Sequence, residues 1–93
     1  MLIGVAGPVA GRQFPLFAET AIGRSSGNDI VIASHMLSRS HTRILFVADH
    51  WMLQDLGTTN GTYVNGAQVT SCRIVDGDLI ALGDAELRFK ILP

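Results

Sequence analysis

The sequence predicts an all-β domain, a sandwich or barrel built from short strands. Short apolar runs recur between turn signals along the chain, several of them alternate apolar with polar residues, and no window of 11 residues holds a convincing helical period. With 93 residues, of which 47% are hydrophobic, the chain can form one domain with a well-filled core and is too short for a second.

Ten apolar runs are expected to form the strands. In chain order they are residues 2–5, 13–17, 21–23, 29–32, 42–47, 51–55, 63–64, 73–75, 78–82 and 86–92. The last run alternates most clearly, because residues 86–91 (Glu-Leu-Arg-Phe-Lys-Ile) place charged side chains on one face and apolar ones on the other. That pattern is typical of a half-buried antiparallel strand.

The runs are separated by residues that tolerate left-handed turn geometry. In chain order these turn signals are Gly7-Pro8, Ala48-Asp49-His50, Gly57, Asn60-Gly61, Asn65-Gly66, Asp76-Gly77 and Gly83-Asp84. No repeat, low-complexity tract or linker interrupts the series. A single domain is therefore expected to occupy residues 1–93.

Composition argues against several classes of protein. Seven basic and eight acidic residues give a formal charge of -1, which lacks the broad positive field of a nucleic-acid-binding protein. One cysteine, Cys72, and three histidines without metal-ligand spacing indicate neither a disulfide framework nor a metal site, and a cytoplasmic location is expected. No apolar stretch approaches the ~20 residues that span a bilayer, and no basic region precedes Met1-Leu2-Ile3-Gly4. Neither membrane insertion nor secretion is expected.

Three polar clusters lie at the edges of the apolar runs. They are Gly23-Arg24, residues 38–41 (Ser-Arg-Ser-His) and residues 55–66, where hydroxyl and amide side chains and two tight turns surround a very short strand. An arginine fork, hydroxyl groups and exposed turn amides are the donors that a tetrahedral dianion needs in the absence of a metal. The clusters therefore predict an anion site and favour a phosphopeptide-binding module.

In this order and at these separations, the clusters resemble the forkhead-associated (FHA) domain family. The matching segments are residues 22–24 (Ile-Gly-Arg), 28–30 (Asn-Asp-Ile), 37–41 (Leu-Ser-Arg-Ser-His) and 55–66 (Asp-Leu-Gly-Thr-Thr-Asn-Gly-Thr-Tyr-Val-Asn-Gly). The resemblance covers nearly the whole chain. It implies a two-sheet antiparallel β-sandwich of about eleven short strands (SMAD/FHA-like), whose loops at one end bind phosphothreonine peptides.

The resemblance also implies roles for five residues in phosphopeptide binding. Arg24 would contact the phosphate oxygens, Ser38 would donate its hydroxyl to them, and Arg39 would add a side-chain or backbone contact. Thr59 would help to frame the phosphothreonine, and Asn60 would hydrogen-bond the peptide main chain next to it. A phosphothreonine carries about -1.5 to -2 charges near neutral pH, so a guanidinium with neutral donors offsets its desolvation better than neutral donors alone.

A second group of residues is expected to shape the loops without touching a ligand: Gly23, His41, Gly61, Asn65 and Gly66. The resemblance implies that His41 is a buried imidazole that hydrogen-bonds backbone groups and keeps the segments around Ser38 and Thr59 in register. The Asn65-Gly66 pair satisfies a type I′ hairpin and needs no ligand to explain it.

The family often reads the residue three positions after the phosphothreonine. The segments that would do so here are residues 33–37 and 82–85, and the former contains Met36 and Leu37 but no arginine. We therefore expect an apolar residue at that position of the partner in preference to an acidic one.

Competing functions are less consistent with the residues. A hydrolase using Ser38 and His41 lacks an acid to orient the histidine and has no nucleophile-elbow sequence, so no enzyme is expected. An oligonucleotide-binding barrel would need basic residues interleaved with aromatic ones. The alternative that stays open is a phospho-independent scaffold or oligomerisation domain of the same fold. The favoured prediction is a monomeric module of a larger protein, without a cofactor, that recruits phosphothreonine-containing partners in kinase signalling.

Overall fold

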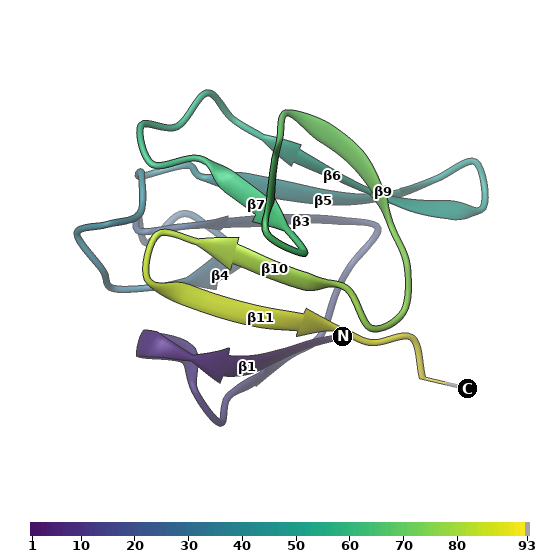
Figure 1. Ribbon diagram of the computed structural model, residues 1–93, viewed down its shortest axis with the longest axis horizontal. Coiled ribbons are helices and arrows are strands. Elements are labelled where there is room, and N and C mark those ends of the chain that lie inside the picture. Colours follow the sequence, from purple (N-terminus) through teal and green to yellow (C-terminus); the bar gives the residue numbers. More distant parts are fainter. Residues whose placement is uncertain (93) are drawn as a thin grey trace.

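The computed structural model describes residues 1–92, which form two β-sheets packed face to face (Figure 1). One sheet has six strands in the order β2-β1-β11-β10-β7-β8, and the other has five in the order β4-β3-β5-β6-β9. The predicted all-β fold class is confirmed, and so is the two-sheet sandwich of eleven strands.

The bounds of the elements follow the chain order. The six-stranded sheet contains β1 (Leu2–Ala6), β2 (Gln13–Phe14), β7 (Thr62–Val64), β8 (Ala67–Val69), β10 (Leu79–Leu82) and β11 (Ala85–Phe89). The five-stranded sheet contains β3 (Glu19–Gly23), β4 (Ile30–Val31), β5 (Thr42–Val47), β6 (His50–Asp55) and β9 (Ser71–Ile74). A single 3-10 turn, η1 (Gly7–Val9), follows β1 where the sequence predicted only a loop.

One strand pair differs from the antiparallel pairing of the others. β3 and β4 run parallel, with Ile22 opposite Ile30 and Gly23 opposite Val31. Parallel neighbours normally need a long crossover. Here only two residues of each strand pair, so the connection of residues 24–29 is enough to bring the chain back alongside β3. That connection forms one of the loops at the end of the sandwich.

Strand β8 was missed by the sequence prediction. Its residues Ala67, Gln68 and Val69 are exposed or half-buried, and three residues are too few to form a clear apolar run. The strand exists because Asn65 and Gly66 both have positive φ, 51° and 84°, which is the geometry of a type I′ turn. This turn folds β8 back onto β7 and places Ala67 opposite Val64.

Strand β11 ends earlier than predicted, at Phe89 and not at Leu92. Its partner β1 begins near Met1, and the backbone pairing stops where the Lys90 N–H donates to the Met1 carbonyl at 2.9 Å. Beyond that point the Ile91 N–H turns to the Asp76 carboxylate at 2.8 Å. Ile91 is consequently 52% exposed, although the alternation placed it on the buried face.

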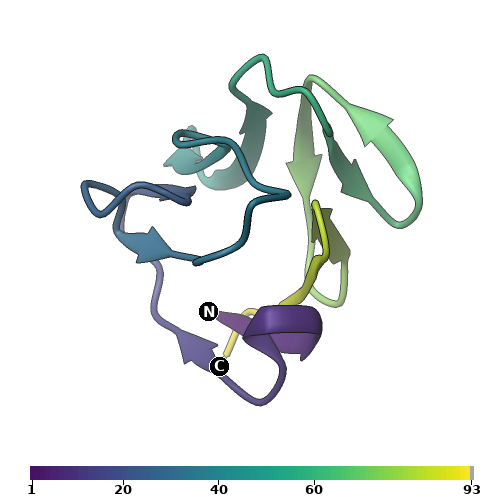
Figure 2. The same cartoon turned by 90° about the vertical axis from the view of Figure 1, so that its left-hand side faces the viewer.

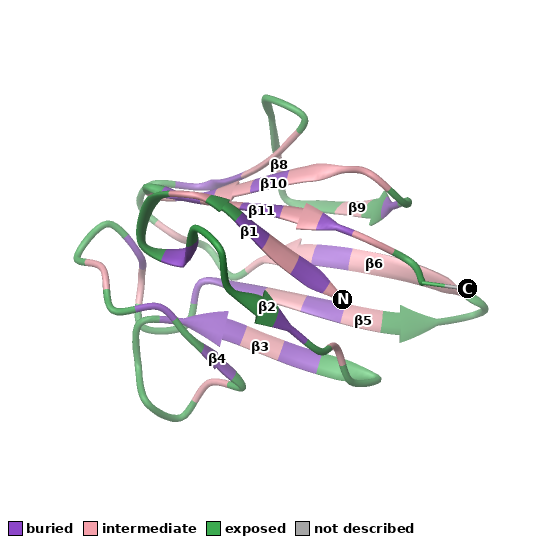
Figure 3. Cartoon of the chain, turned by 90° about the horizontal axis from the view of Figure 1, so that it is seen from below, coloured by how far each residue is buried: buried purple, intermediate pink, exposed green. Residues whose placement is uncertain are grey.

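The hydrophobic core lies between the two sheets and is supplied by alternate residues of the strands (Figure 3). In β11, Ala85, Leu87 and Phe89 are fully buried, while Glu86 and Arg88 on the other face are half-buried. The predicted alternation is therefore confirmed within this strand. Among residues 1–92, no helix is long and apolar enough to cross a membrane.

Candidate functional site

Four connections gather at one end of the sandwich, on the left of Figure 1 and facing the viewer in Figure 2. They are the β3–β4 loop, the β4–β5 loop, the β6–β7 loop and the β10–β11 turn. They meet because β3, β6 and β10 end there while β5, β7 and β11 begin there. All five predicted phosphopeptide-binding residues lie in the first three of these loops.

Arg24 follows directly after β3 and is exposed. Its Nε donates to the Leu37 carbonyl at 3.2 Å, and its backbone N–H donates to the Ser38 carbonyl at 3.0 Å. The side chain is thus anchored through Nε, while its two terminal amino groups make no hydrogen bond to any of residues 1–92. An anchored guanidinium with a free fork is suited to bidentate contact with phosphate oxygens.

Ser38 is half-buried, and its position depends on His41. The Ser38 N–H donates to His41 Nδ1 at 3.0 Å, so the other ring nitrogen, Nε2, must carry the proton that it donates to the Gly61 carbonyl at 2.9 Å. His41 is fully buried and joins the β4–β5 loop to the β6–β7 loop. This is the geometry expected of a residue that keeps the two loops in register.

Arg39 is exposed, and its backbone carries most of its structural contacts. Its carbonyl accepts the Ser25 N–H at 3.1 Å and Asn28 Nδ2 at 2.7 Å, which ties the β3–β4 loop to the β4–β5 loop. Gly23 is buried beside this carbonyl. Only glycine fits there, since a Cβ would lie 2.2 Å from the Arg39 carbonyl oxygen. The exposed side chain of Arg39 takes no part in these backbone contacts and is available to a ligand.

The site carries unneutralised positive charge. In the part of the chain that the structure describes, the ion pairs are Arg43 with Glu19 and Lys90 with Asp76, both at 3.2 Å. Neither Arg24 nor Arg39 takes part in one. Two exposed guanidinium groups without a carboxylate partner favour the binding of an anion over a structural role.

Thr59 and Asn60 lie exposed in the β6–β7 loop. Asn60 Nδ2 donates to the Met36 carbonyl at 2.7 Å, so the asparagine already fastens the two loops together, a role that the sequence did not predict. Its amide oxygen accepts no hydrogen bond from residues 1–92 and can therefore receive a main-chain N–H of a peptide. Thr59 makes no hydrogen bond within the same residues, which leaves its hydroxyl free.

The Asp55 carboxylate, at the end of β6, accepts hydrogen bonds that hold the β6–β7 loop. Asp55 Oδ1 accepts the hydroxyls of Thr58 and Thr62, each at 2.7 Å, and Oδ2 accepts the Gly57 and Thr58 N–H groups at 3.0 and 3.1 Å. The Thr62 hydroxyl donates its one proton to Asp55. In the buried hydrogen bond of 2.8 Å between Thr62 and Thr42, Thr42 must therefore be the donor. A polar chain thus runs from β5 through β7 to the loop.

These hydrogen bonds change the acidity of Asp55. Burial alone would raise the pKa of Asp55, but the bonds from the Thr62 and Thr58 hydroxyls and the loop amides outweigh it and hold the pKa below its usual 3.8. Gly61, which has a positive φ of 81°, completes the turn with its N–H donated to Thr58 Oγ1 at 3.0 Å. The loop is therefore shaped by an ionised carboxylate at neutral pH.

A hollow of about 260 Å³ lies beside the arginine and is lined by Arg24, Ala33, Ser34 and His35. It extends the site from the predicted phosphate anchor along the first half of the β4–β5 loop. Among residues 1–92, no group of three or more His, Cys, Asp or Glu side chains is placed to hold a metal ion.

The profile of the FHA domain family matches residues 20–83, which include the three loops that carry the predicted binding residues. The chain belongs to the FHA domain family. Its similarity to individual members extends beyond the matched segment. The transcriptional regulatory protein EmbR of Mycobacterium tuberculosis (strain ATCC 25618 / H37Rv) is 38% identical over 84 residues, which cover 88% of this chain and 22% of EmbR.

The glycogen accumulation regulator GarA of the same strain is 34% identical over 94 residues, which cover 100% of this FHA domain and 58% of GarA. The chain thus spans less than two thirds of the length of either relative. A solved chain from a structural and functional analysis of phosphothreonine-dependent FHA domain interactions superimposes with a TM-score of 0.90 at 33% identity, over 99% of this chain and 95% of that one. EmbR in complex with a low affinity phosphopeptide also gives a TM-score of 0.90, at 35% identity, over 97% of this chain and 24% of EmbR.

Several residues that organise the site were not predicted to do so. Asn28, Ser34, Thr42, Thr62 and Asp84 act through contacts between segments that lie far apart in the sequence. Only the Asp55-x-x-Thr58 spacing carried a local signal, because a carboxylate three residues before a hydroxyl can close an Asx-type turn. The remaining contacts depend on which loops the sandwich brings together.

Proposed function

We propose that this FHA domain binds phosphothreonine-containing segments of partner proteins through the loops at one end of its sandwich. The observation that carries the proposal is the state of Arg24, whose guanidinium is fixed by the Leu37 carbonyl while its fork is free and its charge is unneutralised. In this arrangement Arg24 holds the phosphate, and the Ser38 hydroxyl adds a neutral donor.

The similar structures support this proposal. EmbR, which is 35% identical, was solved with a phosphopeptide, and the 33% identical chain comes from a study of phosphothreonine-dependent FHA domain interactions. Four of the residues proposed to bind, Arg24, Ser38, Thr59 and Asn60, are exposed or half-buried at the same end of this domain. The site is therefore open to a peptide that lies across the loops.

Discrimination between phosphothreonine and phosphoserine depends on one methyl group. Burying it contributes roughly 0.8 kcal/mol, which is about fourfold in affinity, and close packing around it adds to this preference. We assign Thr59 to the frame around the phosphothreonine and the Asn60 amide oxygen to the peptide main chain. Arg39 adds a second cation at the edge of the site.

Met36 is the residue that we assign to contact the peptide residues following the phosphothreonine and to select among them. Leu37 is 2% exposed and belongs to the core, so it cannot contact a peptide, whereas Met36 is 47% exposed. A flexible thioether side chain packs well against apolar groups. An apolar residue three positions after the phosphothreonine is the expected preference, and a strong preference for aspartate in a peptide array would contradict it.

The domain is a binding module and not an enzyme. Burial, assisted by the Asp78 carboxylate, raises the pKa of Cys72, so its thiol is protonated near neutral pH and is not an activated nucleophile. We assign residues 1–93 to one monomeric module of a longer cytoplasmic protein, which recruits phosphorylated partners in Ser/Thr kinase signalling. Sedimentation equilibrium of the isolated domain tests the monomeric state.

Calorimetric titration with phosphothreonine, phosphoserine and unphosphorylated forms of one degenerate peptide pool tests the proposed function. Micromolar binding that is confined to the phosphothreonine pool is the expected result. Equal binding of the unphosphorylated pool would contradict it and would favour the phospho-independent scaffold.

A further inference from the structure

The segment Ser34–Met36 is held by a turn that belongs to the other sheet. Ser34 Oγ donates to Asp84 Oδ1 at 2.7 Å, across 50 residues of sequence. Ser34 Oγ also accepts the Met36 N–H at 3.2 Å. A hydroxyl has one proton, so Asp84 fixes its direction and leaves the lone pairs to Met36. The side chain of Asp84 is thus linked to the Met36 backbone through the Ser34 hydroxyl.

The backbone of the same turn also packs against this segment. At Gly83, which has a positive φ of 56°, a Cβ would lie 2.7 Å from the Met36 carbonyl oxygen and 2.9 Å from Met36 Cβ. On the other side, a Cβ at Gly7 would lie 1.9 Å from the Asp84 carbonyl oxygen. The β10–β11 turn is therefore wedged between the segment after β1 and the β4–β5 loop, and it cannot shift freely in either direction.

The segment is tied at its other end to the residues proposed to bind the phosphopeptide. The Met36 carbonyl accepts Asn60 Nδ2 at 2.7 Å, and the neighbouring Leu37 carbonyl accepts Arg24 Nε at 3.2 Å. A series of contacts thus runs from Asp84 through Ser34 and Met36 to Asn60, while Arg24 is held by the neighbouring residue Leu37. Met36 is the exposed apolar side chain in the middle of this series.

We propose that Asp84 is a positioning residue that sets the side-chain selectivity of the domain, because it fixes Met36 through Ser34. The inference rests on the proposed function. It adds the contact that holds rigid the part of the domain facing the peptide residues after the phosphothreonine. A fixed Met36 presents one shape to the peptide and rejects side chains that do not fit, whereas a mobile Met36 adapts to many. Phosphate binding itself depends on Arg24 and Ser38. Their hydrogen bonds go to the Leu37 and Ser38 carbonyls and to His41, and none of them involves the side chain of Ser34 or Asp84.

The test compares four phosphothreonine peptides of the form Ala-Ala-Ala-pThr-Ala-Ala-Xaa-Ala, with Xaa as Leu, Ala, Asp or Lys. For the unaltered domain we expect dissociation constants that differ by about tenfold between the best and worst peptide. Asp84→Ala and Ser34→Ala should each reduce this ratio to about twofold, with the average affinity changed by less than about threefold. The double variant should equal the single ones, since both remove the same contact.

Two further variants separate positioning from loss of charge or fold. Asp84→Asn keeps a side-chain oxygen that can accept the Ser34 proton, so it should restore the selectivity of the unaltered domain. Glu86→Ala removes a carboxylate that lies nearby and has no hydrogen bond within residues 1–92, and it should change neither selectivity nor affinity. Amide hydrogen exchange provides an independent measurement, because Asp84→Ala should accelerate exchange of the Met36 N–H, and Glu86→Ala should not.

An unchanged selectivity ratio in Asp84→Ala, with the unaltered domain still binding the peptides, would overturn the inference and leave the proposed function standing. A uniform loss of affinity for all four peptides would also overturn it, because Asp84 would then support binding in general. If the unaltered domain bound none of the phosphothreonine peptides, the proposed function and the inference would fall together.

Discussion

Two connections at opposite ends of this sandwich are built by different means. At the binding end, the β6–β7 loop is shaped by side-chain hydrogen bonds that involve His41, Asp55, Asn60 and Thr62. At the opposite end, β5 and β6 are joined by a two-residue turn in which Ala48 and Asp49 both have positive φ, and exposed apolar side chains lie beside it. A fixed shape for a polar loop therefore requires many specific contacts, whereas a tight turn requires only suitable backbone angles.

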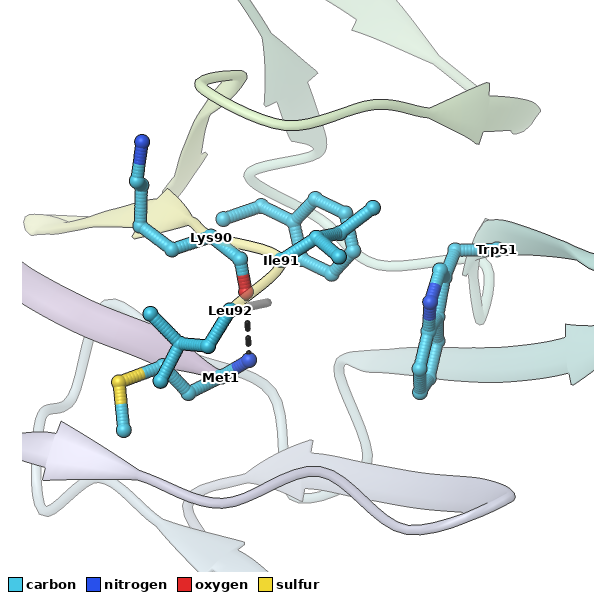
Figure 4. Close-up of a pocket in the computed structure, with 6 residues that line it drawn as sticks. Met1, Trp51, Lys90, Ile91 and Leu92 are labelled. Atoms are coloured by element: carbon cyan, nitrogen blue, oxygen red, sulfur yellow. Dashed lines mark hydrogen bonds between the residues drawn. The ribbon is translucent and has the colours of Figure 1, made fainter.

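The apolar surface at the opposite end surrounds Trp51. A hollow of about 210 Å³ there is bordered by Trp51, Ile91 and Leu92 (Figure 4). Beside it the Met1 amino group donates to the Lys90 carbonyl at 2.7 Å. Trp51 packs against Phe46 and Phe89, with ring centroids 4.9 and 5.8 Å apart. Apolar packing around Trp51 therefore contributes to stability at this end, and substitutions of these core residues should affect folding without affecting binding.

The largest expected effect is on folding and comes from the core. Phe89→Ala should lower the free energy of unfolding by about 3–5 kcal/mol, because Phe89 is fully buried and the change leaves a cavity beneath Trp51. Urea denaturation measures the loss. Phosphopeptide affinity of the folded fraction should be unchanged, and a parallel loss of affinity would break the separation between the two ends.

His41→Ala should lower the free energy of unfolding by about 2–4 kcal/mol, because it leaves the Ser38 N–H and the Gly61 carbonyl without their buried partner. Its matched control lies at the other end. His50 is only half-buried and contacts the Ala48 carbonyl at 3.0 Å, so His50→Ala should cost less than about 0.5 kcal/mol. Equal losses in urea denaturation would mean that the buried histidine does not organise the loops.

The Asp55 carboxylate predicts a pH dependence. Its pKa in the folded state lies below the usual 3.8, so ionised Asp55 stabilises the fold above about pH 4, and this contribution is lost as the pH falls through the folded-state pKa. Asp55→Asn should therefore be less stable than the unaltered domain at pH 7, with a difference that shrinks below pH 4. Thermal unfolding across pH 2–7 measures it, and a constant difference would show that the charge is not what holds the loop.

The smallest expected effect concerns the exposed apolar residues at the end opposite the loops. Val75 is 51% exposed, so Val75→Ala should change the free energy of unfolding by less than about 0.5 kcal/mol and leave phosphopeptide affinity unchanged. A clear loss of affinity, measured by calorimetry, would extend the binding surface to the end where no binding residue is placed.

The sequence predicted the strands wherever burial produced alternation, as in β11, and failed where burial was weak. β8 is an edge strand with no fully buried residue, and its existence depends on the turn that precedes it. The site residues were predicted from a resemblance, because clusters that lie far apart in the chain come together only in the fold. The hydrogen bond between Ser34 and Asp84 had no sequence signal, since neither residue has a local pattern and 50 residues separate them.

Whether the loop end holds the phosphate is tested by comparing the phosphothreonine affinity of Arg24→Ala with that of Arg73→Ala. Arg73 is an exposed arginine in β9 near the opposite end. Arg24→Ala should lose at least about 2 kcal/mol of binding free energy, roughly 30-fold in Kd, with a nearly unchanged melting temperature. Arg73→Ala should bind as the unaltered domain does. Intact affinity in Arg24→Ala, or an equal loss in both variants, would contradict the assignment of the phosphate to the loop end.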